Sequence, residues 1–320
     1  MESSLEIEGM TLTREPICCA PTGDRCGEGV LWHAAEEAVY WTDINRFLVH
    51  RFDPRTRCVR SWYFDEPVTA VLLTNIEGTL ALSLGSGIIL WKPSSDQRSH
   101  PIFQLPGWPK VRLNDAGVDP AGSLWAGSMR NNVNADGSEG EAGGTEGVIY
   151  RIDGDGAATV WEQHIGVANT FVWNAAADRF YFADTLQNII WFYDYDRQSG
   201  SIRKAGTYLA GFDRGLPDGS AIDENGYVWN CRWGGGCIVR ISPAGQVDRI
   251  VELPVRNITN CTFGGRDRNV LYVTTAAGGR GATDRLAGSL FEITTDTRGL
   301  EERPWMLAPR VTNSLPFSKQ

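Results

Sequence analysis

A strand pattern that recurs six times constrains the fold of this chain more than any other feature of its sequence. Each copy contains an aromatic or aliphatic strand, a polar stretch, a second strand, and a turn rich in Asp, Pro or Gly. The first strands of the copies lie at residues 39–41, 80–82, 124–126, 181–183, 228–230 and 271–273. Repetition at about 40 to 55 residues is typical of β-propeller blades, because one blade alone leaves an apolar sheet face uncovered. The six copies predict an all-β, six-bladed β-propeller.

The N-terminal region carries one strand more than the six copies need. Residues 11–20 precede the first complete copy and can pair with the last blade, which closes the ring and removes exposed strand edges. The predicted propeller domain therefore spans residues 11–310, between an N-terminal extension, 1–10, and a C-terminal tail, 311–320. Segment 131–146 interrupts the third copy and is rich in Gly and acidic residues. We expect this segment to be either a disordered loop or a lid over one end of the channel.

Charge and hydropathy limit the partners of the chain. Its 30 Lys and Arg residues against 39 Asp and Glu residues give a formal net charge of -9, and no basic run could follow a phosphate backbone. No window approaches the roughly 18 apolar residues of a membrane-spanning helix, and the N-terminus lacks the pattern of a secretion signal. The sequence predicts a cytoplasmic protein that binds neither nucleic acid nor a membrane, with its seven cysteines reduced.

Most standard catalytic motifs are absent from the sequence. The four histidines show no zinc-protease spacing, no Gly-x-Ser-x-Gly elbow occurs, and the Gly triplet at 234–236 is not followed by Gly-Lys-Ser/Thr. Asn260-Cys261-Thr262 matches the N-glycosylation pattern, and without a secretion signal we interpret it as a chance match. Hydrolase chemistry in this chain would have to depend on oxygen-donor side chains.

Oxygen-donor residues occur where the inner strands of several blades should begin. Each stands shortly before a strand-like run and is flanked by Gly, Pro or Ala; they are Glu28, Asn114, Asp115, Asn169 and Asp218. Any one of them alone is also typical of a turn or a cap. The innermost strands of a propeller converge on its axis, so such residues can meet around one ion although they are far apart in sequence.

At these residues the chain resembles the SMP-30/gluconolactonase/regucalcin family. The matching pieces run in family order over residues 20–295, and together they are specific although no single piece is. They are Cys26-Gly27-Glu28-Gly29-Val30-Leu31-Trp32, Tyr40-Trp41-Thr42-Asp43-Ile44, Arg112-Leu113-Asn114-Asp115, Val118-Asp119-Pro120-Ala121-Gly122, Phe182-Ala183-Asp184-Thr185, Pro217-Asp218-Gly219, Phe263-Gly264-Gly265 and Leu271-Tyr272-Val273-Thr274-Thr275.

The resemblance implies a six-bladed propeller with one divalent metal ion in its channel. The ion would be held by Glu28, Asn169 and Asp218, with water completing the shell. Two carboxylates and an amide suit Ca²⁺, Mg²⁺ or Mn²⁺, and Zn²⁺ or Fe(II) remain admissible. In this hypothesis the metal polarises a lactone carbonyl, and Asp218 serves as the base that takes a proton from water.

The resemblance also implies a set of substrate-binding residues. Arg112 and Asn114 occupy the family positions that orient the hydroxyls or carbonyl of the substrate, and Trp233 offers either a flat surface for a sugar ring or a blade-core side chain. Two positions depart from the family pattern. Asn169 is followed by Thr170 where Gly is usual, and Asn132 stands where some relatives place a substrate-contacting Glu.

The sequence therefore predicts a metal-dependent lactonase that hydrolyses a sugar aldonolactone, a gluconolactone-like hexono- or pentonolactone, to the aldonic acid. The alternatives are a non-catalytic propeller that binds calcium or another divalent metal, and an esterase or organophosphatase on the same scaffold. A protein-interaction platform whose acidic residues are solvated turns is a further alternative.

Overall fold

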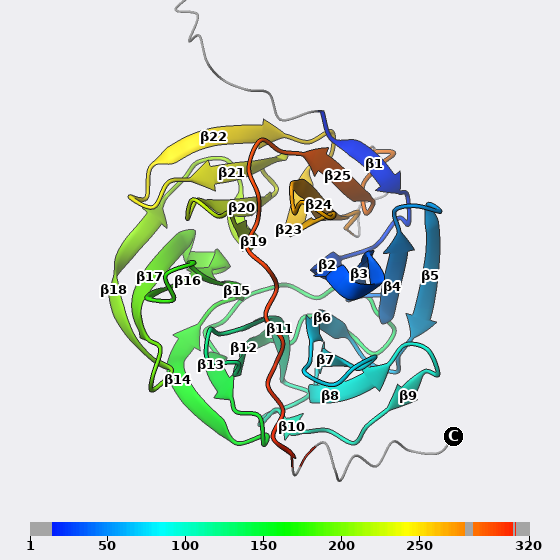
Figure 1. Cartoon of the computed structure of the whole chain (residues 1–320), viewed down its shortest axis with the longest axis vertical. Helices are drawn as coiled ribbons and strands as arrows, with labels where there is room; N and C mark the ends of the chain where they lie inside the picture. The colour runs from blue at the N-terminus through cyan, green and yellow to red at the C-terminus, as the bar shows by residue number, and fades with distance from the viewer. Residues whose placement is uncertain (1–14, 279–283, 310, 312–320) are drawn as a thin grey trace, which may run out of the picture.

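Six sheets surround a central channel in the computed structural model, which describes residues 15–278, 284–309 and 311 (Figure 1). Neighbouring strands within each sheet are antiparallel, and the first strand of each blade faces the channel. The predicted all-β, six-bladed propeller is confirmed. The predicted extension 1–10 and residues 312–320 of the predicted tail lie outside the described residues.

The first three blades follow one another along the chain, as the colours of Figure 1 show. Blade 1 contains β2 (Gly27–His33), β3 (Ala38–Asp43), β4 (Leu48–Asp53) and β5 (Cys58–Tyr63). Blade 2 contains β6 (Val68–Leu73), β7 (Leu80–Leu84), β8 (Gly87–Lys92), β9 (Gln97–Arg98) and β10 (Phe103–Gln104). Blade 3 contains β11 (Val111–Val118), β12 (Leu124–Arg130), β13 (Gly147–Ile152) and β14 (Ala158–Ile165).

The other three blades complete the ring. Blade 4 contains β15 (Ala168–Trp173), β16 (Arg179–Asp184), β17 (Ile189–Asp196) and β18 (Ser201–Ala210). Blade 5 contains β19 (Leu216–Ile222), β20 (Val228–Trp233), β21 (Cys237–Ile241) and β22 (Val247–Glu252). Blade 6 contains β23 (Asn257–Gly264), β24 (Val270–Ala276), β25 (Leu290–Thr294) and β1 (Ile17–Ala20).

Strand β1 supplies the outer strand of the last blade. It runs antiparallel to β25, with Ile17 opposite Glu292 and Cys18 opposite Phe291. The prediction that an N-terminal strand closes the ring is confirmed for these residues, while residues 11–14 lie outside the described part of the chain.

Buried acids in alternate blades hold the blade cores together. In blade 3, the carboxylate of Asp119 accepts hydrogen bonds from the indole N–H of Trp125 at 2.8 Å and from Arg151 Nε at 3.2 Å. In blade 5, Asp223 accepts the equivalent bonds from Trp229 and Arg240, and in blade 1 Asp24 accepts a bond from the Trp41 indole while His50 Nε2 lies 3.2 Å from Asp24 Oδ1. A buried polar group needs such partners, so these acids and His50 serve folding.

The C-terminal segment, residues 299–309, crosses one end of the channel (Figure 1, red ribbon). The backbone N–H of Leu300 donates to Ile222 O in blade 5 at 3.2 Å, and that of Trp305 donates to Leu73 O in blade 2 at 2.8 Å. The Trp305 side chain is fully buried, among residues of blades 2 and 3. This segment therefore connects opposite sides of the ring.

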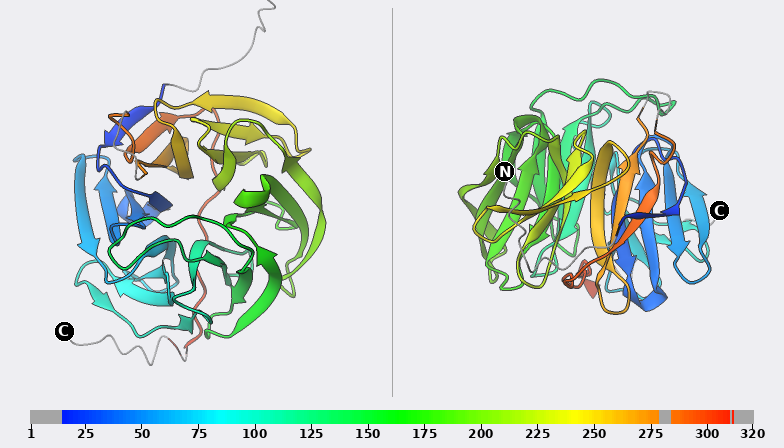
Figure 2. Two further views of the ribbon diagram at one scale, coloured as in Figure 1. Left: turned by 180° about the vertical axis from the view of Figure 1, so that it is seen from behind. Right: turned by 90° about the horizontal axis from the view of Figure 1, so that it is seen from above.

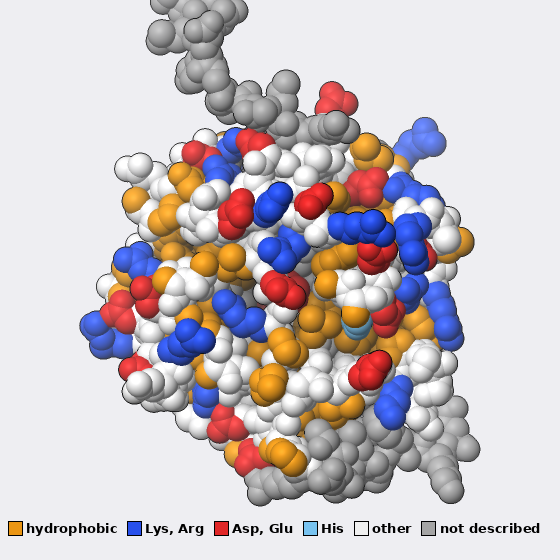
Figure 3. Space-filling model, in the orientation of Figure 1, with side chains coloured by type: hydrophobic (Ala, Val, Ile, Leu, Met, Phe, Trp, Pro, Cys, Tyr) orange, Lys and Arg blue, Asp and Glu red, His pale blue; other side chains and the backbone are white. Residues whose placement is uncertain are grey.

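The helices that the structure describes are short, and charged side chains of both signs lie on the surface. The 3-10 turns η1 (Ala34–Glu36) and η2 (Thr185–Gln187) have three residues each, and no helix in the described ranges is long and apolar enough to cross a membrane. On the face that carries the C-terminal segment, Lys and Arg side chains alternate with Asp and Glu (Figure 3). All seven cysteines are unpaired, and four of them are buried.

Candidate active site

Each of the six innermost strands departs from regular pairing near its start. The shifts in register fall between Glu28 and Leu31, Val68 and Ala70, Leu113 and Ala116, Asn169 and Val172, Pro217 and Ser220, and Ile258 and Cys261. A β-bulge changes the direction in which side chains point. Because the six bulges lie at equivalent positions of six converging strands, they bring polar side chains together at one end of the channel, which we call the upper end.

Two of the polar side chains at the upper end are buried carboxylates. Glu28 and Asp218 are only 7% and 6% exposed. Burial raises the pKa of Glu28 to about 6. Burial, followed by the negative charge of Glu28, raises the pKa of Asp218 well above its usual range. Burial destabilises the charged form of both carboxylates. A cation bound between them would compensate for their negative charges, so the pair forms a site that favours a cation.

The third predicted metal-binding residue, Asn169, has a fixed orientation. Its amide nitrogen donates to Thr185 Oγ1 at 2.8 Å, and its Oδ1 accepts a hydrogen bond from Asn114 Nδ2 at 3.0 Å. An amide oxygen has two lone pairs, so Asn169 Oδ1 can bind a cation while it accepts this bond.

Arg112 connects two of the predicted substrate-binding residues. Its Nη1 donates to Asn114 Oδ1 at 2.7 Å, while Nε and Nη2 both donate to Asn132 Oδ1, at 3.1 and 2.8 Å. Burial lowers the pKa of Arg112 to about 10, and the guanidinium stays charged at neutral pH. The structure thus joins Asn132, Arg112, Asn114 and Asn169 in one chain of hydrogen bonds.

The backbone at Thr170 explains why glycine is usual at this family position. Thr170 has a φ of 62°, in the left-handed region that favours glycine. Its N–H donates to Asp115 Oδ2 at 2.9 Å, and its hydroxyl donates to the carbonyl oxygen of Asp218 at 2.6 Å. These bonds link blades 3, 4 and 5 and compensate for the strained backbone.

Asp115 is a third buried carboxylate at the upper end. It accepts hydrogen bonds from the N–H groups of Thr170 and Ala116. Burial, with a smaller contribution from the charge of Glu28, raises its pKa to about 7. The sequence marked Asp115 as an oxygen donor without a role, and its backbone partners show that it holds two neighbouring bulges in place.

Sequence reasoning missed two asparagines of the site. Asn260, on β23, donates from Nδ2 to Glu28 Oε2 at 3.0 Å. Asn230, on β20, donates to the backbone carbonyl of Asp218 at 3.1 Å. In the sequence, Asn260 stands out only as part of a glycosylation pattern. The signal that could have found it is its place in the sixth copy, since the bulge of β23 matches the bulge of β19 that carries Asp218.

Trp233 lies apart from the hydrogen-bonded residues. It is the last residue of β20, paired with Leu216 at the upper end of blade 5, and it is partly exposed. Within the described part of the chain, no hydrogen bond or ring contact joins it to the other candidate residues. Its position near the mouth of the channel leaves its role as a sugar-stacking residue a prediction.

Segment 131–146 extends over the upper end of the channel toward blade 1. Gly137 O accepts hydrogen bonds from Arg25 Nη1 at 3.2 Å and from Asn45 Nδ2 at 3.0 Å, and Val133 packs against Ile44 and Phe47. In Figure 2 this segment arches over the end of the propeller opposite the C-terminal segment. These contacts favour the lid over the disordered loop.

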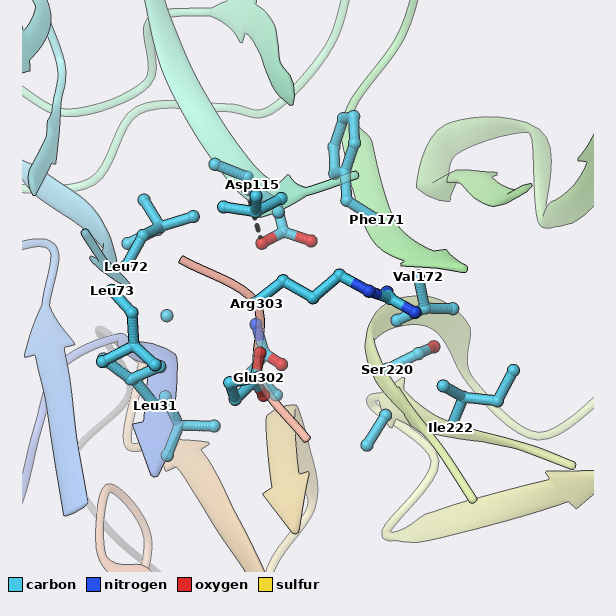
Figure 4. A pocket seen from close by; sticks show the side chains of 18 of the residues that line it. Leu31, Leu72, Leu73, Asp115, Phe171, Val172, Ser220, Ile222, Glu302 and Arg303 are labelled. Atoms are coloured by element: carbon cyan, nitrogen blue, oxygen red, sulfur yellow. Dashed lines mark hydrogen bonds between the residues drawn. The ribbon is translucent and has the colours of Figure 1, made fainter. Parts of the chain in front are cut away.

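Below the bulges, the channel continues as a cavity of about 110 Å³ that ends at the C-terminal segment. Most of the residues that line it are apolar residues of the inner strands, and Asp115, Glu302 and Arg303 also face it (Figure 4). Glu302 accepts a hydrogen bond from Thr262 Oγ1 at 2.8 Å, and burial raises its pKa. The polar site is thus separated from the opposite face by this cavity and by the C-terminal segment.

The donor set at the upper end fits a hard divalent cation. In the part of the chain that the structure describes, no three His, Cys, Asp or Glu side chains form a metal-holding group. An ion would therefore depend on the Asn169 amide together with Glu28 and Asp218. Carboxylate and amide oxygens are the ligands preferred by Ca²⁺ and Mg²⁺, and a cation would compensate for the repulsion between the two buried acids.

A six-bladed propeller with two carboxylates and an amide at one end of its channel belongs to a class of scaffolds suited to a hard cation and a small polar ligand. The family model of the SMP-30/gluconolactonase/LRE-like region matches residues 26–277. The chain belongs to this family, and the resemblance drawn from its motifs is confirmed.

Relatives from several organisms match nearly the whole chain. Pentonolactonase XacC from Haloferax volcanii is 32% identical over 307 residues, covering 92% of this chain and 97% of the relative. Regucalcin from Homo sapiens is 29% identical, covering 91% of this chain and 95% of the human protein. A crystal structure of a calcium-binding protein, regucalcin, from Agrobacterium tumefaciens has a TM-score of 0.84 at 23% identity, covering 92% of this chain and 98% of that one. The last similarity shows the shared fold.

Proposed function

We propose that this protein hydrolyses a sugar aldonolactone, a hexono- or pentonolactone, to the aldonic acid, and that a divalent metal ion is required. The observation that carries the proposal is the meeting of Glu28 and Asp218, two buried carboxylates with raised pKa values, beside the oriented amide of Asn169. The names of relatives support the substrate class: a pentonolactonase from Haloferax volcanii and a 6-deoxy-6-sulfogluconolactonase from Pseudomonas putida.

In the proposed site, Glu28, Asn169 and Asp218 hold the ion. The chemistry that a divalent ion supplies there is polarisation of the lactone carbonyl and stabilisation of the oxyanion formed on it. Asp218 accepts a proton from the attacking water and returns a proton to the ring oxygen as the carbon–oxygen bond breaks. Hydrogen bonds from Thr170 and Asn230 to its backbone carbonyl keep Asp218 in place for both transfers.

The proposed role of Arg112, Asn114 and Asn132 is to orient the sugar. Arg112 is held by both asparagines before any ligand arrives, so little side-chain freedom is lost on binding, and orientation contributes to the rate. Trp233 at the mouth would offer an apolar surface to the ring. The lid formed by segment 131–146 would limit the exchange of water with bulk solvent.

The test is a panel of hexono- and pentonolactones in which acid release is followed in a pH-stat, with spontaneous hydrolysis subtracted. We expect at least one lactone to be hydrolysed, the rate to fall to background with a chelator, and one of Ca²⁺, Mg²⁺, Mn²⁺, Zn²⁺ or Fe(II) to restore it. A chelated, metal-free enzyme that keeps its rate would contradict the metal requirement. Stoichiometric metal binding without hydrolysis of any lactone or simple ester would support the non-catalytic alternative.

A further inference from the structure

The inner strand of blade 6 contributes a side chain that contacts both acid-bearing strands. Strand β23 packs between β19, which carries Asp218, and β2, which carries Glu28. Its bulge directs Asn260 toward the channel, where the residue is buried and only 7% exposed. No residue of blade 6 belongs to the predicted metal-binding or substrate-binding set.

The hydrogen bonds of Asn260 define which way its amide faces. The backbone N–H of Cys261 donates to Asn260 Oδ1 at 2.8 Å, so the NH₂ group is the one that faces Glu28. That group donates to Glu28 Oε2 at 3.0 Å, and the N–H of Gly29 donates to the same oxygen at 3.0 Å. With both donors on Oε2, Oε1 is the oxygen that Glu28 can offer to a cation.

Asn260 also packs directly against the residue that follows Asp218. A Cβ atom added to Gly219 would lie 2.2 Å from Asn260 Cγ, a distance that real contacts do not reach. Glycine at position 219 is therefore needed for the close approach of the Asn260 side chain. The amide of Asn260 thus lies between Glu28 on one side and the Asp218–Gly219 backbone on the other.

We propose that Asn260 is a positioning residue that holds Glu28 and Asp218 at the separation and orientation needed to bind the divalent cation. The inference rests on the proposed function for the identity of the metal-binding residues. Asn260 acts through Glu28, because its own carbonyl oxygen is directed to the Cys261 N–H.

The test measures binding of Mn²⁺ to the chelator-treated, full-length protein by isothermal titration calorimetry. Asn260→Ala and Asn260→Leu, which is similar in size but has no donor, should each weaken Mn²⁺ binding about 10- to 100-fold, as is usual when a hydrogen bond to a metal ligand is lost. Far-UV circular dichroism should match that of Asn225→Ala, a control that removes a hydrogen bond to Thr297 on a turn remote from the site, and the thermal midpoint should stay well above the assay temperature. At saturating Mn²⁺ the lactone KM should stay within about twofold and most of kcat should return.

A second variant tests the contact without changing Asn260. Gly219→Ala should also weaken Mn²⁺ binding, because the added methyl group displaces the Asn260 side chain. In the Asn260→Ala background the same change should have almost no effect, since the space is then free. Equal effects of Gly219→Ala in both backgrounds would overturn the proposed contact.

The outcomes separate this inference from the proposed function. If the wild-type protein binds Mn²⁺ and both Asn260 variants bind it equally well, the inference alone is overturned. If the wild-type protein binds no Mn²⁺ and hydrolyses lactones in the presence of a chelator, the proposed metal site and the inference are both wrong.

Discussion

The two ends of the channel are built from the same six strands but serve different purposes. At the upper end, the strands bulge, and buried charged or polar side chains such as Glu28 and Asp218 meet. At the lower end, the strands regain regular pairing, and the C-terminal segment covers the channel with Glu302 and Arg303 while its Trp305 side chain is buried in the core of blades 2 and 3. The difference teaches that bulges in six inner strands can gather polar side chains at one end of a channel, while a separate segment of the chain covers the other end.

We expect the largest effect on the comparison between the two ends when one acid is removed from the upper end. Asp218→Asn keeps the size of the side chain but removes the charge and the proposed base, so we expect lactone hydrolysis to fall about 100- to 10,000-fold. The thermal midpoint of the metal-free protein should stay the same or rise, because one of two mutually repelling buried carboxylates is gone. Steady-state kinetics and differential scanning calorimetry measure the two effects. Activity within tenfold of the wild type would exclude Asp218 as the base.

The opposite result is expected at the lower end. Trp305→Ala removes a fully buried aromatic side chain, and we expect the free energy of unfolding to fall by about 3 to 5 kcal/mol. At temperatures where the variant is folded, kcat should stay within about threefold of the wild type, because the site lies across the channel. Met306→Ala, at a side chain that is 50% exposed, is the matched control and should cost less than about 0.5 kcal/mol. A large loss of kcat in folded Trp305→Ala would show that the two ends are coupled.

The smallest expected effect is a dependence of the free energy of unfolding on pH, caused by the buried carboxylates at the upper end. The pKa values of Glu28 and Asp115 in the folded protein, about 6 and about 7, lie above their ordinary values of 4.5 and 3.8. The folded state therefore binds more protons than the unfolded chain in this range, and the free energy of unfolding falls as pH rises.

We expect the metal-free protein to lose on the order of 2 kcal/mol between about pH 6 and about pH 8 in denaturant titrations. Saturating Mn²⁺ should remove most of this loss, and Asp115→Asn should reduce it. A metal-free protein equally stable at both pH values would mean that the buried acids have ordinary pKa values.

Much of the fold could be predicted because its cause is local and repeated. The strand copies around Trp41, Trp125 and Trp229 recur because every blade must bury one sheet face against the next, and the strand that closes the ring follows from counting. The C-terminal segment could not be predicted in this way, since it carries no copy of the repeat and its partners, such as Leu73 and Gly154, lie in distant blades.

The candidate site was predictable only in part. Glu28, Asn169 and Asp218 stand out as polar residues flanked by small ones, and the bulges place them at one level of the channel. Asn260 did not stand out, because its neighbours are ordinary strand residues and its importance depends on its contact with Gly219 across two blades. The left-handed backbone of Thr170 likewise became visible only with the hydrogen bonds that hold it.

Closure of the ring by β1 has a consequence for synthesis of the protein. Ile17 is among the first described residues to leave the ribosome, and its partner Glu292 is among the last. The edge of β25 stays uncovered until these two distant parts of the chain meet, and such long-range pairing is slow. Strand β1 therefore has no partner for most of translation, and the ring stays open until β25 has been made, the period in which chaperones have the most to protect.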